Sequence, residues 1–75
     1  MNEHNSDYLV IYEKTSTGYS AYVPDLPGCI TTGANLNDTK TNMQEAIRGH
    51  LAVMREFGDP IPQPTTEAER MQVSA

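Results

Sequence analysis

Apolar and aromatic residues gather in three short runs in the first half of the chain, and a longer periodic stretch follows them. The runs span residues 8–14, 19–23 and 29–32 and are rich in the β-branched and aromatic residues that favour strands. Between the first two runs, Ser16-Thr17-Gly18 supplies a turn. The pattern predicts an antiparallel hairpin followed by a third strand, with a turn longer than the tightest two-residue class.

Both sides of the first predicted strand are apolar. Because side chains alternate along a strand, Leu9 and Ile11 share one side. The other side carries Tyr8, Val10 and Tyr12. A hairpin with one solvated face would alternate with polar residues instead. We therefore expect this strand to contribute all five residues to an oligomer interface, unless the C-terminal tail folds back over the second face.

Two prolines, an aspartate and a glycine separate the second and third predicted strands. Proline fixes φ and lacks an N–H donor, so neither Pro24 nor Pro27 fits the middle of a central strand. Asp25 can bond to nearby backbone, and Gly28 can adopt positive φ. Together with Leu26, these residues predict a structural corner between the strands.

The periodic stretch predicts one long amphipathic helix. Asn35 is a suitable N-cap, and Asp38 stands at the third helical position, close to a capping box. Gly58 provides the C-terminal cap and Pro60 follows as a stop signal. Gly49 within the helix costs about 1 kcal/mol relative to alanine. The residues that share one helical face are Leu36, Met43, Ala46, Ile47, His50, Leu51, Met54 and Phe57.

After the helix, the proline-rich segment 60–65 is expected to be extended. Thr65 or Thr66 is expected to cap a single helical turn over residues 67–70, and the alternating residues 71–75 predict a last strand. The predicted fold class is therefore α+β. It is a two-layer sandwich of one long helix on an antiparallel three- to four-stranded sheet, in the order strand, strand, strand, helix, strand.

The length of 75 residues predicts a single domain, residues 1–75, preceded by a disordered tail at residues 1–7. So small a core is marginal alone, so we expect a homo-oligomer, a dimer or larger. A single cysteine, no signal peptide and no membrane-spanning run point to the cytoplasm. The net charge of −5 disfavours nucleic acid and favours a basic protein partner, or it serves only to keep the protein in solution.

Residues with catalytic potential are present but form no recognisable constellation. His50 is expected to be a packed or interface residue, because no nucleophile or orienting partner is identifiable. Cys29 has no electropositive neighbours in sequence, which favours a buried structural thiol. Glu13, Asp25 and Glu45 follow no metal-ligand spacing. The residues thus predict a binding module that is not an enzyme and has no cofactor or metal.

The order of several segments carries a resemblance to a known family. The segments are Tyr8 to Lys14, Gly18-Tyr19, Val23-Pro24-Asp25-Leu26-Pro27-Gly28-Cys29, Thr32-Gly33, Glu45-Ala46-Ile47 and Gly58-Asp59-Pro60-Ile61-Pro62. In this order, over about Tyr8 to Pro64, they resemble the N-terminal domain of HicB-type antitoxins, a group with solitary, UPF0150-type members.

The resemblance implies a partial ribonuclease-H-like fold without its catalytic acids. It also implies that the chain neutralises HicA, a small basic toxin that cleaves messenger RNA, by binding it and masking its active site. Candidate contacts for such a toxin, assigned from charge alone, are Glu13, Asp25, Glu45 and Glu56. The DNA-binding segment that follows this domain in many HicB antitoxins has no counterpart before Ala75, so we expect no DNA-binding domain.

Other functions stay open at this stage. Three strands and a helix are similar to part of the double-stranded RNA-binding fold, although the acidic charge opposes that function. A non-catalytic oligomeric protein with an unknown partner is a second alternative. A vestigial hydrolase with clustered carboxylates is a third.

Overall fold

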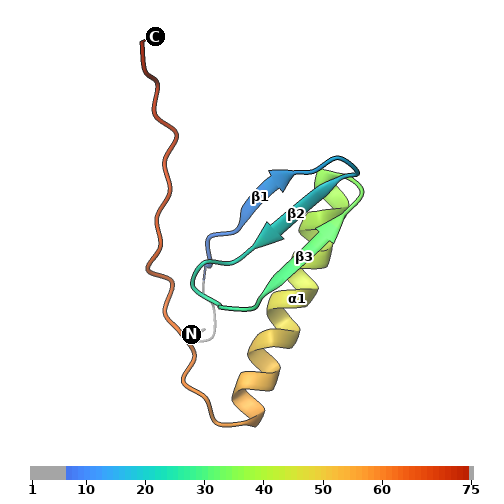
Figure 1. Ribbon diagram of the computed structural model, residues 1–75. Helices are drawn as coiled ribbons and strands as arrows, with labels where there is room; N and C mark the ends of the chain where they lie inside the picture. Colours follow the sequence, from blue (N-terminus) through green and yellow to red (C-terminus); the bar gives the residue numbers. More distant parts are fainter. Residues whose placement is uncertain (1–6, 75) are drawn as a thin grey trace.

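A computed structural model describes residues 7–74, which form one sheet and one helix packed as two layers (Figure 1). The elements are β1 (Ile11–Lys14), β2 (Tyr19–Tyr22), β3 (Ile30–Gly33) and α1 (Leu36–Glu56). The three strands are antiparallel neighbours in the order β1-β2-β3, so β1 and β3 are the two edges of the sheet. This confirms the predicted α+β class with a strand, strand, strand, helix order.

The core lies between the sheet and α1. Tyr12 is paired with Ala21, and Ala21 is paired with Thr31, which defines a row across the three strands. Ala21 is only 2% exposed, so this row faces the helix. The buried apolar core consists of Ala21, Val23, Leu26, Cys29 and Met43. Five side chains are a small core, in line with the expectation from chain length.

Two glycines allow the first turn of α1 to lie close to the sheet. A Cβ atom at Gly18 would overlap the carbonyl oxygen of Gly33, and a Cβ at Gly33 would lie 2.7 Å from the backbone nitrogen of Thr39. Thr39 is completely buried and its hydroxyl donates to the Asn35 carbonyl at 2.7 Å. A larger residue at Gly33 would push the first turn of α1 away from β3, and one at Gly18 would push the hairpin turn away from the end of β3.

Both ends of α1 are capped as predicted. The Asn35 side chain accepts a hydrogen bond from the Asp38 N–H at 2.8 Å, which satisfies a donor that the first turn leaves free. Gly58 has a φ of 71°. Its N–H donates to the Arg55 carbonyl at 3.1 Å, and the Asp59 N–H donates to the Met54 carbonyl at 2.8 Å. This double pattern is a Schellman motif.

The C-terminal part of the prediction is partly wrong. Residues 60–65 are extended as expected, but residues 67–70 form no helical turn and residues 71–74 form no strand. Thr65 and Thr66 donate to Asp25, across the chain, instead of capping a helix. The tail runs as an irregular extended chain past the β1 side of the sheet (Figure 1).

Other boundaries shift by a few residues. The first strand begins at Ile11, three residues later than the apolar run that starts at Tyr8. The expected disorder of residues 1–7 falls almost wholly outside the described residues. Within residues 7–74, α1 is the only long helix, and it is too polar to cross a membrane. The ribonuclease-H-like relationship stays a prediction.

Candidate partner-binding site

The corner after β2 is a compact turn built around one buried side chain. Leu26 has no exposed surface. Its N–H donates to the Val23 carbonyl at 3.0 Å, and its carbonyl accepts from the Cys29 N–H at 3.0 Å. Gly28 adopts a φ of 86°, the left-handed region that glycine enters without strain. The predicted corner is thus held by local hydrogen bonds and by burial of Leu26.

Asp25 at this corner binds the C-terminal tail. Its carboxylate accepts from the backbone N–H groups of Thr65 and Thr66, both at 2.9 Å. It also accepts from the Thr66 hydroxyl at 2.6 Å and the Thr65 hydroxyl at 3.3 Å. The Thr66 hydroxyl, followed by the Thr66 N–H, holds the pKa of the Asp25 carboxyl below its ordinary value. We call this set of four bonds the tail clasp.

A further hydrogen bond holds the tail a few residues before Thr65. The Tyr8 hydroxyl donates to the Pro62 carbonyl at 2.5 Å, so the segment before β1 and the proline-rich segment are joined. Further along, residues Ala68 to Arg70 line one hollow together with Leu9 to Tyr12. The tail thus runs along the β1 edge with residues 65–74 exposed, and it does not cover the second face of the sheet as the tail-cover alternative required.

The five residues expected at an oligomer interface are divided between the two sheet faces. All five are half-buried. Tyr8, Val10 and Tyr12 pack against the core on the helix side. Leu9 and Ile11 alternate with them and therefore lie on the opposite side of the sheet. The structure describes one chain, so the interface itself stays a prediction.

The sheet face opposite the helix keeps an apolar row. Ile11 is paired with Tyr22, and Tyr22 is paired with Ile30, so these side chains lie side by side across the three strands. Their exposure rises along the row: Tyr22 is 39% exposed and Ile30 is 70% exposed. The uncovered apolar surface is thus greatest at the β3 edge.

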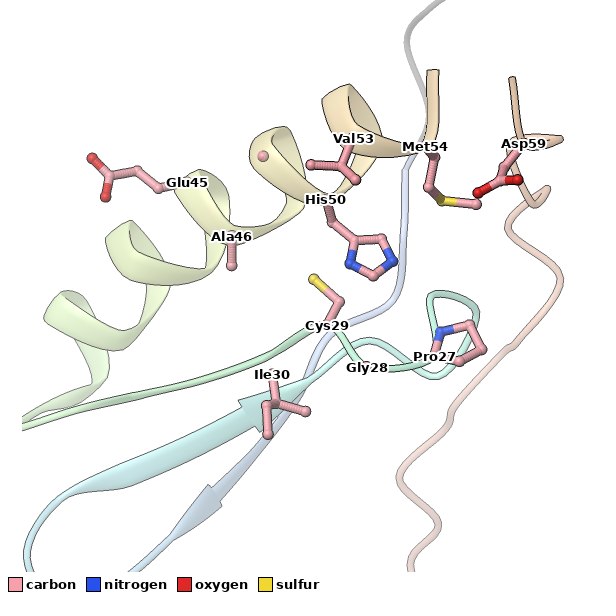
Figure 2. A pocket seen from close by; sticks show the side chains of 11 residues that line it. Pro27, Gly28, Cys29, Ile30, Glu45, Ala46, His50, Val53, Met54 and Asp59 are labelled. Atoms are coloured by element: carbon pink, nitrogen blue, oxygen red, sulfur yellow. The ribbon is translucent and has the colours of Figure 1, made fainter. Parts of the chain in front are cut away.

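A groove of about 770 Å³ lies at that edge, between α1 and the segment from the corner to β3. Figure 2 shows His50 directed from α1 into this groove, above Cys29 and beside the corner. Val53 contributes apolar surface, whereas Ile30 lines the groove at β3 with its side chain directed away from α1. The acids Glu45 and Asp59 stand at opposite ends of the groove. We call it the β3–α1 groove. It is lined by Pro27, Gly28, Cys29, Ile30, Glu45, Ala46, Gly49, His50, Val53, Met54 and Asp59.

The chemistry of the β3–α1 groove does not resemble that of a catalytic cysteine site. Cys29 is 3% exposed, and burial raises the pKa of its thiol. A nucleophilic thiol needs the opposite shift, toward the thiolate. Among residues 7–74, no cluster of three histidine, cysteine or acidic side chains could hold a metal ion.

The four acids expected to contact a toxin are not brought together. Glu13 lies exposed on β1, at the opposite edge of the sheet from the groove. Asp25 is occupied by the tail clasp. Glu56 is exposed in the last turn of α1, whereas Glu45 lines the β3–α1 groove. Charge alone therefore selected these residues without identifying a shared surface.

Sequence reasoning missed Asp59, Ile30 and Val53 as groove residues. Asp59 stands directly after Gly58, and the Schellman motif turns it back toward the groove. A helix stop followed by an acid was visible in the sequence, but the direction of that acid depends on how α1 lies on β3.

The chain is a small α+β domain with an open groove, and comparison with known proteins assigns its family. A family model described as "HicB_like antitoxin of bacterial toxin-antitoxin system" matches residues 8–74. A chain in the solved structure of the "HicA3 and HicB3 toxin-antitoxin complex" is similar with a TM-score of 0.70 and 32% identity. That match covers 80% of this chain and 70% of the other. The chain belongs to the HicB-like antitoxin family.

Relatives differ in length. A UPF0150 protein of Thermoplasma acidophilum is 36% identical over 61 residues, which cover 80% of this chain and 88% of that protein. An uncharacterized 14.9 kDa protein of Haemophilus phage HP1 is 38% identical over 55 residues. The match covers 73% of this chain but 41% of the phage protein, so this chain corresponds to less than half of that relative.

Proposed function

We propose that this chain acts as an antitoxin by binding a small basic HicA-type toxin and masking its active site. The observation that carries the proposal is the 32% identity, at a TM-score of 0.70, to a chain of the HicA3 and HicB3 toxin-antitoxin complex. The net charge of −5 supports it, because an acidic surface attracts a basic protein and repels competing nucleic acid. On this proposal the chain itself has no catalytic role.

The test combines binding and growth. The gene next to the one encoding this chain is expected to encode a small basic protein. Co-expression should give a complex that survives purification, and inducing the neighbour alone should arrest growth that this chain restores. Affinity is expected to fall as salt rises, because complementary charges contribute to the encounter. If the neighbour neither binds nor arrests growth, the antitoxin proposal is wrong.

The RNA-binding alternative is tested with the same material. A gel shift on duplex RNA at low salt should show no binding by this chain, because phosphates and the acidic surface repel each other. A salt-dependent shift would favour the RNA-binding alternative over the antitoxin proposal.

A further inference from the structure

The β3 edge offers backbone groups as well as the apolar groove. The Val23 N–H donates to the Cys29 carbonyl at 3.1 Å, so Cys29 faces β2. Because residues alternate along an antiparallel ladder, Thr31 also faces β2, whereas Ile30 and Thr32 face outward. The outward carbonyl of Thr32 accepts from the Asn42 side-chain amide at 2.8 Å. The N–H and C=O of Ile30 and the N–H of Thr32 therefore face the open edge, and those of Ile30 lie beside the groove.

The charges around the β3–α1 groove are of one sign. Its lining contains the carboxylates of Glu45 and Asp59 and no lysine or arginine. The other two described hollows differ, since one contains Lys40 and the other contains Arg70. An apolar groove with an acid at each end suits an apolar side chain flanked by cationic ones. A second copy of this acidic chain would meet like charge there.

We propose that the β3–α1 groove is the docking site for an extended, basic segment of the toxin partner, which pairs with β3 at Ile30 as an added strand. This inference rests on the proposed function and specifies where the partner binds. The segment's backbone bonds to the outward N–H and C=O of Ile30, and one apolar side chain enters the groove over Gly49 and Val53. Lysine or arginine beside it faces Glu45 and Asp59.

The proposed docking mode gives a reason for a glycine at position 49. It lies exposed in the middle of α1, and a Cβ built on it meets nothing within 4 Å. No packing within the chain requires a glycine there. Without a side chain at this position, however, the groove stays open, so an incoming side chain can approach the helix backbone.

Two pairs of variants test the site, with the purified basic toxin partner as the probe. The steric pair is Gly49→Leu and Ala52→Leu, two exposed positions on α1 of which only Gly49 lines the groove. The charge pair is Glu45→Lys and Glu67→Lys, two exposed acids of which only Glu45 lines the groove. The two leucine variants end in the same side chain and the two lysine variants change the net charge equally, so a difference within a pair reports mainly position.

The groove variants are expected to weaken binding, measured by calorimetry, by about tenfold or more, while both controls stay within about threefold. Circular dichroism melts of the four variants check that each is folded. If the wild-type chain binds but the groove variants match their controls, the groove is not the docking site although the antitoxin function stands. If the wild-type chain binds no basic partner, the proposed function fails and this site fails with it.

Light scattering tests the remaining possible occupant of the groove, which is a second copy of this chain. If Gly49→Leu and Glu45→Lys change the oligomeric state but leave toxin binding intact, the groove is an interface between copies of this chain. That result would overturn the docking proposal.

Discussion

The two edges of the sheet differ in what lies beside them. At the β1 edge, hydrogen bonds to Tyr8 and Asp25 hold the tail, and Ala68 to Arg70 lie across a hollow from the strand. At the β3 edge, Ile30 is 70% exposed beside an acidic, apolar groove. An exposed strand edge is a site for unwanted pairing unless it is covered or used. The chain's own tail thus runs beside one edge, and the other edge is the one at which we propose that the partner binds.

The largest effect is expected from a substitution in the buried core. Leu26→Ala deletes a completely buried side chain in the corner between β2 and β3. We expect the free energy of unfolding, measured by urea denaturation, to fall by about 2–5 kcal/mol, enough to unfold much of so small a domain. The matched control Ile30→Ala removes an exposed side chain and should change stability by less than about 0.5 kcal/mol. Equal losses would mean that the β3 edge is packed and not open.

Gly18→Ala tests the contact between the hairpin turn and the end of β3. The added Cβ would overlap the backbone carbonyl of Gly33, which cannot swing aside like a side chain. We expect a loss of about 1–3 kcal/mol in the same measurement. An unchanged midpoint would show that the turn adjusts independently of β3.

Gly49→Ala should act in the opposite direction, since the added methyl group meets nothing within 4 Å. Replacing a helical glycine at an exposed site is expected to stabilise the domain by about 0.5–1 kcal/mol, measured as a higher denaturation midpoint. Toxin affinity should fall less than with Gly49→Leu, because a methyl group fills less of the groove. A destabilised Gly49→Ala variant would mean that the backbone there is under a constraint within the chain.

The smallest effect on global stability is expected from opening the tail clasp. Asp25→Ala removes all four acceptor contacts with Thr65 and Thr66, so proteolysis after residue 66 should speed up several-fold while the melting temperature hardly changes. In acid, the tail clasp of the wild-type chain is expected to open as it does in Asp25→Ala, because protonation removes the carboxylate that accepts the four hydrogen bonds. Because the pKa of Asp25 is lowered in the folded state, the clasp is intact above the ordinary value of about 3.9. It is lost as pH falls through the lowered pKa.

Amide exchange of Thr65 and Thr66 measures this opening directly. Their protection should decrease on acidification in the wild-type chain and be absent at every pH in Asp25→Ala. Protection that is independent of both the variant and pH would mean that the tail is held by other contacts.

Local signals in the sequence determined the elements of this protein. The strand runs, the corner prolines with Gly28, the Asn35 cap and the Gly58 stop are all short-range features, and each one was predicted from neighbouring residues alone. The family resemblance followed from the same local segments in their order.

Only the tertiary structure decided which surfaces are available. Asp25 and Thr66 are 41 residues apart in sequence, and their bond replaced the predicted helical turn because a carboxylate across the chain offered the tail's N–H groups a partner. Glu45 was one acid among ten until the packing of α1 on β3 placed it in the lining of the same groove as Ile30 and Asp59. Alternation tells which residues share a face, but contacts between distant segments determine whether that face is covered, and these contacts leave no periodic pattern in the sequence.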